Sequence, residues 1–234
     1  MKSLGIIPAR FASTRFPGKP LIDIGGKTMI QRVYEQSLLS GLNKVVVATD
    51  DERIADEVSR FGGEFVMTAS NHQSGTDRCA EVAKNLPGYD IVINIQGDEP
   101  FIDPIQINLV RDCFNDEKVQ LATLIKAIHS EQELYNPNIP KVIIGNQQQA
   151  IYFSRYPIPY LRNPSSSHQF YKHIGIYGYK TATLLEITKL QPSILELAES
   201  LEQLRWIENG YQIQTKLTTI ESIAIDSPSD LLRL

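Results

Sequence analysis

The sequence predicts an α/β fold in which a parallel β-sheet carries helices on both faces. Apolar runs rich in Val and Ile, continuous rather than alternating, indicate buried strands at residues 4–7, 44–49 and 90–96. Between these strands, amphipathic patterns indicate helices at residues 28–41, 51–63 and 75–86. Strands and helices in repeated alternation favour a parallel sheet covered on both sides.

The predicted helices carry their own start and stop signals. Asp50 and Asp51 can cap the helix at residues 51–63, and Gly62 and Gly63 end it. Gly41 supplies a stop for the helix before the second strand. These signals separate the helices from the strands that follow them.

The pattern changes after residue 103. We expect a strand at residues 119–128, a hairpin formed by 141–145 and 148–154, a polar loop at 162–168, a strand at 171–179, one amphipathic helix at 193–210, a short strand at 223–226 and a helix that starts near Pro228. No linker divides the chain, so residues 1–234 are expected to form a single domain. Within it, residues 1–103 would bind a nucleotide, and residues 104–234 would supply a substrate lid or a dimer contact.

The composition excludes several classes of partner. A net charge of -4 and a pI near 5.6 provide no general attraction for nucleic acid or an anionic membrane. No segment approaches the roughly 20 apolar residues that span a bilayer, and the apolar run at the N-terminus is too short for a signal peptide. Cys79 and Cys113 form no CxxC motif. These features predict a cytoplasmic, soluble protein without membrane insertion.

The stretch PARFASTRFPGKP, residues 8–20, is the first candidate for chemistry. It follows the first strand, where ligands bind open α/β sheets, and it places Arg10, Arg15 and Lys19 in a loop without carboxylates. The hydroxyl of Ser13 adds a further donor. Because guanidinium and ammonium groups bind phosphate oxygens, the loop suggests a polyphosphate site. The alternative is a solvated loop whose cations pair with surface acids. Neither a Walker A motif nor GxGxxG is present.

The stretch NIQGDEPFI, residues 94–102, ends the third predicted strand. Its Gln96 and Asp98 should therefore emerge on the same side of the sheet as the basic loop. A carboxylate beside a polyphosphate site suits Mg²⁺, whereas Gly-Asp-Glu-Pro is also good turn chemistry by itself. Asp226, at the end of the last predicted strand, is a second candidate metal ligand or a simple helix cap.

Three weaker candidates remain. HQSGTDR, residues 72–78, can present N–H groups and hydroxyls at a helix N-terminus, or can serve only as a helix cap. Alternation along residues 171–179 puts His173 and Tyr177 on one face of a strand, which is also compatible with a structural role. Glu202 and Gln203 fit an ordinary polar face of the helix at 193–210.

The ordered set of motifs resembles the CMP-KDO synthetases, the 3-deoxy-manno-octulosonate (KDO) cytidylyltransferases. The resemblance runs from about residue 4 to the C-terminus and includes the stretches IIPARFASTRFPGKPL, HQSGTDRCAEVA, NIQGDEPFI, HIGIYGY, ESLEQLRWIENG and IDSPSDL. It implies a nucleotidyltransferase fold with a mixed, mainly parallel sheet and a smaller β-rich lid or dimerisation region. The implied reaction converts CTP and KDO to CMP-KDO and diphosphate, which activates KDO for lipopolysaccharide biosynthesis.

The same resemblance implies roles for individual residues. The triphosphate would be held by Arg10, Ser13, Arg15 and Lys19, and the cytidine pocket would include Gln73, Ser74, Gly75 and Arg78. Gln96 and Asp98 would lie at the nucleotide and metal centre, with Asp98 and Asp226 as Mg²⁺ ligands. The sugar acid would contact Arg155, Arg162, His173, Tyr177, Glu202 and Gln203. The family usually forms homodimers, and the segment between residues 141 and 179 is the expected contact.

Three other functions remain open at this level. A cytidylyltransferase for a related sugar acid, such as 8-amino-KDO or a sialic acid, would share these motifs. A non-catalytic nucleotide-binding module would lack a metal centre, whereas both carboxylate positions are filled here. A dinucleotide-dependent dehydrogenase would need the glycine fingerprint after the first strand, which is missing.

Overall fold

A mixed β-sheet runs through the centre of the molecule. The computed structural model describes residues 1–12, 16–163, 167–221, 224–225 and 227–233. Its strands are β1 (Ser3–Ala9), β2 (Lys44–Thr49), β3 (Phe65–Met67), β4 (Ile91–Asn94), β5 (Leu121–Ala127), β6 (Lys141–Ile144), β7 (Ala150–Ser154), β8 (Tyr171–Lys180) and β9 (Ile213–Leu217). The order across the sheet is β3-β2-β1-β4-β8-β5-β9, and the β6–β7 hairpin pairs with β8 through β6.

The direction of the strands divides the sheet. β3, β2, β1 and β4 are parallel neighbours, and β5 and β9 are parallel to each other. β8 runs antiparallel between β4 and β5, so it joins the two parallel parts into one sheet. This arrangement confirms the predicted α/β fold with a mixed sheet.

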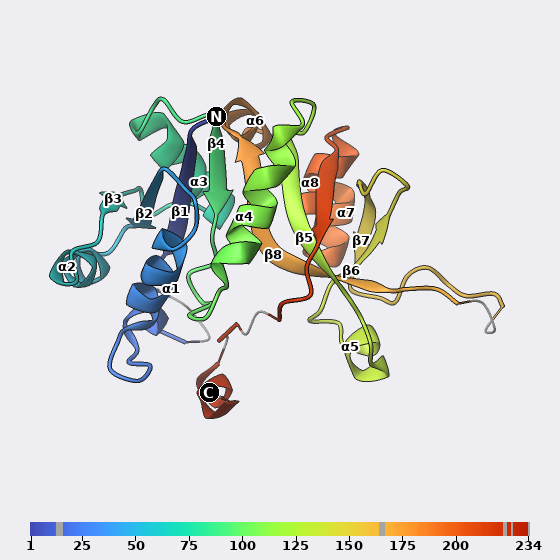
Figure 1. The fold of residues 1–234 in the computed structure, drawn as a ribbon, viewed down its shortest axis with the longest axis horizontal. Helices are drawn as coiled ribbons and strands as arrows, with labels where there is room; N and C mark the ends of the chain where they lie inside the picture. The colour runs from blue at the N-terminus through green and yellow to red at the C-terminus, as the bar shows by residue number, and fades with distance from the viewer. Residues whose placement is uncertain (13–15, 164–166, 222–223, 226, 234) are drawn as a thin grey trace.

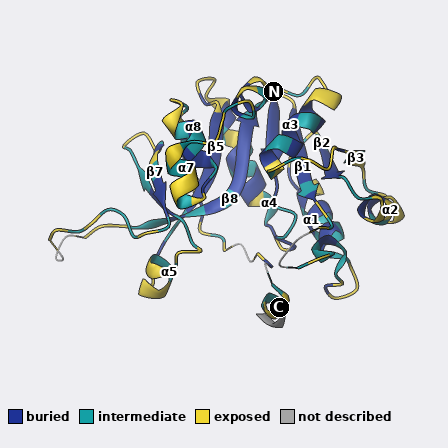
Figure 2. Cartoon of the chain, turned by 180° about the vertical axis from the view of Figure 1, so that it is seen from behind, coloured by how far each residue is buried: buried dark blue, intermediate teal, exposed yellow. Residues whose placement is uncertain are grey.

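Helices cover both faces of the sheet (Figure 1). They are α1 (Met29–Leu38), α2 (Glu52–Arg60), α3 (Gly75–Asn85), α4 (Pro104–Asp112), α5 (Glu131–Tyr135), α6 (Thr181–Ile187), α7 (Ile194–Glu199) and α8 (Gln203–Glu208), with short 3₁₀ turns at Lys19–Leu21, Cys113–Asn115 and Pro228–Arg233. α1, α2 and α4 contribute to one apolar cluster, and α3, α6 and α8 contribute to the other. Figure 2 shows the central strands mainly dark blue between these layers. No helix among the described residues combines the length and apolarity needed to cross a bilayer.

Two expectations about the C-terminal region were wrong. The amphipathic pattern at residues 193–210 forms two short helices, α7 and α8, because Ser200 takes a left-handed backbone (φ 51°, ψ 49°). Arg155 bonds the carbonyl oxygens of Glu199 and Ser200, at 2.6 and 3.2 Å, and so stabilises the break from outside the helix. Of the expected strand at 223–226, Ala224 and Ile225 lie outside any strand, while the other two positions fall outside the described residues. The helix expected to start near Pro228 is present as a 3₁₀ helix, Pro228–Arg233.

Gly178 allows α4 to pack directly on β8. A Cβ atom at this position would lie 2.6 Å from the Phe114 ring and 2.7 Å from Cγ1 of Val110, and both neighbours are fully buried. Contacts this short cannot be relieved by a side-chain rotation into solvent. The second glycine of the stretch HIGIYGY therefore sets the distance between the helix layer and the sheet.

We predict that Gly178→Ala lowers the free energy of unfolding by about 1–3 kcal/mol, the usual range for overpacking a close-packed core. Urea denaturation monitored by circular dichroism measures this change. Gly145→Ala is the matched control, since the three atoms nearest to its new methyl group belong to the end of the flexible side chain of Gln149. Equal stability of the two variants would contradict the packing role of Gly178.

Candidate active site

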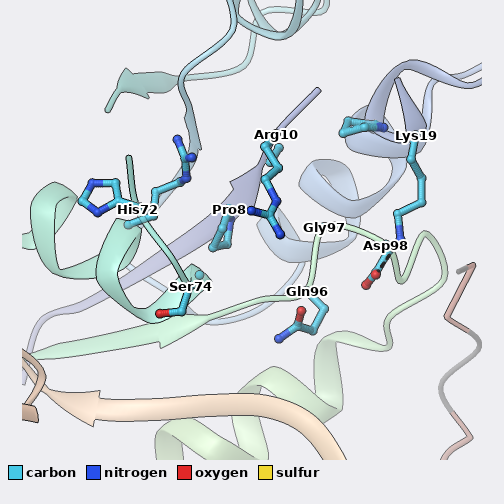
Figure 3. Close-up of a pocket in the computed structure, with 12 residues that line it drawn as sticks. Pro8, Arg10, Lys19, His72, Ser74, Gln96, Gly97 and Asp98 are labelled. Carbon is cyan, nitrogen blue, oxygen red and sulfur yellow. Dashed lines mark hydrogen bonds and ion pairs between the residues drawn. The ribbon is translucent and has the colours of Figure 1, made fainter. Parts of the chain in front are cut away.

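The pocket of interest lies at the carboxyl ends of β1 and β4, where the sheet is parallel. It has a volume of about 260 Å³, just below the usual range for small-molecule sites. Its lining comprises Pro8, Ala9, Arg10, Lys19, Pro20, His72, Ser74, Gly75, Arg78, Gln96, Gly97 and Asp98. Figure 3 shows that these side chains come from three segments, namely the basic loop, the start of α3 and the end of β4.

The basic loop folds back on itself beside β1. The backbone N–H of Gly18 donates to the carbonyl of Phe11 at 3.0 Å, and Gly18 has a left-handed φ of 71°. The Phe11 ring packs against Gly18, and the guanidinium of Arg53 lies 3.3 Å from the centroid of that ring. This closure places Arg10 and Lys19 on the pocket wall. Ser13 and Arg15, which were also predicted to bind the triphosphate, fall outside the described residues.

Lys19 and Asp98 form an ion pair across the pocket (Figure 3). Lys19 Nζ lies 2.8 Å from Asp98 Oδ2 and also donates to the carbonyl of Ile225 at 2.9 Å. The backbone N–H of Ile225 donates to the Asp98 carbonyl at 2.9 Å. A residue near the C-terminus is therefore held directly beside Asp98. Asp226 itself falls outside the described residues.

The donor set around Asp98 fits a hard divalent cation. Mg²⁺ is usually held in proteins by one or two carboxylates together with substrate phosphates and water. Asp98 provides a partly exposed carboxylate on the pocket wall, next to cations suited to phosphate. Among the described residues no group of three or more His, Cys, Asp or Glu side chains could hold a metal ion.

The segment at residues 72–78 starts α3, as predicted. Ser74 is the N-cap: its hydroxyl accepts from the Asp77 N–H at 3.1 Å, and the Asp77 carboxylate accepts from the Ser74 N–H at 3.2 Å. The helix-cap interpretation of this motif is thus confirmed, while Ser74 and Gly75 also line the pocket. Gln73 is exposed and donates to the carbonyl of Asn71, away from the pocket lining.

Arg78 lines the pocket although it is almost fully buried. Its guanidinium lies 3.3 Å from Asp50 Oδ1 and donates to the hydroxyl of Thr68. His72 also lines the pocket and pairs with Glu81. The sequence reasoning did not single out His72. The motif showed that His72 lies just before the start of α3. Its pairing with Glu81 depends on α3, because the helix brings Glu81 back beside the preceding turn.

On the other side of β4, the strand β8 carries two predicted sugar-binding residues. His173 and Tyr177 lie side by side, with ring centroids 5.1 Å apart, and Tyr177 packs edge-on against Trp206 at 5.1 Å. His173 Nε2 lies 2.9 Å from the Thr123 hydroxyl. Burial lowers the pKa of His173 to about 3, so this imidazole is neutral near pH 7. The buried hydroxyl of Tyr177 has no hydrogen-bond partner within the described part of the chain.

The remaining predicted sugar contacts differ in their surroundings. Arg155 donates to three backbone carbonyls, those of Pro137, Glu199 and Ser200, so part of its donor capacity is already used. Arg162 is exposed, and Gln203 is buried at the start of α8. Glu202 accepts a 2.7 Å hydrogen bond from Thr76 in the first turn of α3.

Gln96 connects the pocket to β8. Its side-chain nitrogen donates to the carbonyl of Gly175 at 2.7 Å. The pairing of β5 with β8 changes register at Thr123, and Gly175 lies in that irregular stretch of β8. Gln96, which was predicted for the nucleotide, therefore contacts the strand that carries His173 and Tyr177, which were predicted for the sugar acid.

The pocket lies at the carboxyl ends of two neighbouring parallel strands, where open α/β sheets bind ligands, and it places Arg10 and Lys19 beside the Asp98 carboxylate. Together with the mixed, mainly parallel sheet, this arrangement is that of the nucleotidyltransferase class. The profile described as "Cytidylyltransferase" matches residues 4–217. The 3-deoxy-manno-octulosonate cytidylyltransferase of Parabacteroides distasonis is 56% identical over 241 residues, covering 99% of this chain and 96% of that protein. The protein of the same name from Bacteroides thetaiotaomicron is 55% identical over 240 residues, with the same coverage.

A solved structure gives the same result. The structure of CMP:2-keto-3-deoxy-manno-octonic acid synthetase complexed with CTP superimposes with a TM-score of 0.94 at 44% identity, covering 100% of this chain and 96% of that one. The chain belongs to the 3-deoxy-manno-octulosonate cytidylyltransferase family.

We predict that the burial of His173 lowers the free energy of unfolding as the pH drops from about 6.5 toward 3. Over this range the unfolded chain binds a proton on His173 that the folded chain excludes, since the folded pKa is about 3. The contribution of this residue to the change of the unfolding free energy with pH reaches about 1.4 kcal/mol per pH unit. Urea denaturation of wild type and His173→Gln at several pH values measures it. The variant should show the shallower pH dependence, and parallel curves would contradict the prediction.

Proposed function

We propose that this chain transfers CMP from CTP to KDO, producing CMP-KDO and diphosphate, and thereby activates KDO for lipopolysaccharide biosynthesis. The observation that carries the proposal is the pocket in which Lys19 and Asp98 meet between the ends of β1 and β4. The name of the curated relatives and the CTP complex of the solved relative support the same substrates.

The basic loop would bind the triphosphate. Arg10 and Lys19 already lie on the pocket wall, and Arg15 would add a third cation from the same loop. Guanidinium groups fit phosphate oxygens by paired hydrogen bonds, and an ammonium group acts as a point charge. Lys19 and Arg15 would stabilise the diphosphate leaving group, with Arg10 nearer the α-phosphate. Ser13, Gln73, Ser74, Gly75, Arg78 and Gln96 would complete the nucleotide site.

The reaction is an in-line displacement in which the anomeric hydroxyl of KDO attacks the α-phosphorus of CTP. Asp98 and Asp226 would hold Mg²⁺, which supplies charge neutralisation at the phosphates and lowers the pKa of an attacking hydroxyl. In the structure Lys19 neutralises Asp98. An incoming triphosphate offers Lys19 an alternative anionic partner, which would free the Asp98 carboxylate for its other role. The protein's main contribution is then positioning and charge neutralisation.

The sugar acid would lie along β8 and the start of α8. Arg155 or Arg162 would pair with its carboxylate, while His173, Tyr177, Glu202 and Gln203 would contact its hydroxyls. The low pKa of His173 means that this imidazole would act as a neutral hydrogen-bonding group rather than as a charge. The hydroxyl of Tyr177, which has no hydrogen-bond partner among the described residues, would be available for such a contact.

The enzyme would work in the cytoplasm as a homodimer. Apolar side chains are exposed on β7, on the following loop and on α7, namely Ile151, Tyr156, Tyr160, Ile194 and Leu197. A concentration of exposed apolar residues on one region is typical of a protein interface. The segment between residues 141 and 179 would form part of the contact. Residues 1–103 would serve the nucleotide and residues 104–234 the sugar and the dimer, within one domain.

We predict that the wild-type chain releases diphosphate from CTP in the presence of Mg²⁺ only when KDO is added. A coupled diphosphate assay with CTP, UTP and ATP, and with KDO or 8-amino-KDO, tests both substrates at once. Mass spectrometry of the product identifies CMP-KDO. Release that requires 8-amino-KDO, or that occurs without any sugar acid, would contradict the proposed function.

We predict that Asp98→Asn lowers kcat/KM by several orders of magnitude while the protein stays folded. The substitution preserves size but removes the charge that faces Lys19 and would hold the metal. Asp112→Asn, a surface carboxylate on α4, is the control for a lost negative charge. Near-normal turnover of Asp98→Asn at saturating Mg²⁺ would show that the metal assignment is wrong.

A further inference from the structure

The first turn of α3 has two different neighbours. On one side Ser74 and Gly75 line the pocket at the end of β1 and β4. On the other side Thr76, which is only 3% exposed, points its hydroxyl to Glu202. One helical turn therefore contacts both the pocket and a side chain that lies 126 positions further along the chain.

Glu202 is presented from a turn that is held on several sides. It is the N-cap residue of α8, two positions after the left-handed Ser200. Arg155 bonds the backbone of Glu199 and Ser200, and Arg205 pairs with Glu196 through two hydrogen bonds across the turn. Because both flanks are fixed, the Glu202 carboxylate has little freedom to move relative to α3.

The partly buried surroundings of Glu202 make its carboxylate depend on hydrogen bonds to stay charged. Burial raises the pKa of Glu202, whereas hydrogen bonds from Thr76 and Ser74 oppose that rise and favour the carboxylate. The N-terminus of α3 also favours a negative charge at this place. Removing the Thr76 hydroxyl would leave a partly buried carboxylate without one of its donors, so its position and its charge would both be less well defined.

We propose that Thr76 is a positioning residue that holds the Glu202 carboxylate in place for the sugar acid, and that it does so from the same helical turn that lines the nucleotide pocket. The inference rests on the proposed function, since Glu202 is assigned there to the sugar acid. Thr76 itself would touch neither substrate. It would align the sugar side of the site with the nucleotide side through a single hydrogen bond.

Steady-state kinetics of Thr76→Val, Thr76→Ser and Glu202→Gln test the proposal. Valine keeps the shape of threonine and leaves the Ser74–Asp77 cap intact. Thr76→Val should raise KM for KDO roughly tenfold and change KM for CTP by less than about twofold, as expected for the loss of one hydrogen bond to a charged group. Thr76→Ser, which retains the hydroxyl, should restore KM for KDO to near the wild-type value.

The controls separate positioning from stability. Thr215→Val removes another buried hydroxyl, which donates a hydrogen bond to the carbonyl of Gln148 and lies on β9, the strand at the opposite edge of the sheet from β3. This control should leave both KM values unchanged. In a Glu202→Gln background, Thr76→Val should add little further effect, because the two residues act as one unit. Full additivity of the two substitutions, or equal rises in both KM values, would overturn the proposal. Absence of CMP-KDO formation by the wild type would instead refute the proposed function.

Discussion

The parallel pairing of β1 with β4 is the constraint on which the site depends. The register places Ile6 opposite Asn94, so the chain leaves both strands at the same edge of the sheet. The basic loop that follows β1 and the turn that contains Asp98 therefore meet, and Lys19 can reach the Asp98 carboxylate at 2.8 Å. Neither segment forms a phosphate and metal site alone, because one carries only cations and the other only acids.

The antiparallel strand β8 connects this edge to the second half of the chain. β8 lies next to β4, and Gly178 lets α4 approach closely enough to hold the two strands in one packed layer. The same strand carries His173 and Tyr177, and its backbone accepts a hydrogen bond from Gln96. A sugar acid bound along β8 would consequently lie beside a nucleotide bound at β1 and β4. Proximity of the two reacting groups is the largest contribution that such a site can make without covalent chemistry.

Opposite charges organise the pocket before any substrate binds. Lys19 neutralises Asp98, Asp50 faces the buried Arg78, and Glu202 rests against the start of α3. Each pair brings together groups that are far apart in the sequence. Charges that are partly or fully buried are costly without partners, so these pairs favour defined positions of the side chains. In the proposed reaction, the triphosphate would replace Asp98 as the anionic partner of Lys19, and a divalent cation would replace Lys19 as the cationic partner of Asp98.

The sequence by itself determined the α/β class, the buried strands that precede the basic loop and Asp98, and a helix that starts within residues 72–78, because these follow from local patterns of apolar residues and local hydrogen bonds. The family motifs also indicated which residues should share a site, and the pocket brings Arg10, Lys19, Ser74, Gly75, Arg78, Gln96 and Asp98 together. Only the tertiary structure decided that residues 193–210 form two helices, since Arg155 stabilises the break from another segment. The pairs His72–Glu81 and Thr76–Glu202 were likewise visible only in the tertiary structure. A contact between two single side chains produces no periodic pattern in the sequence.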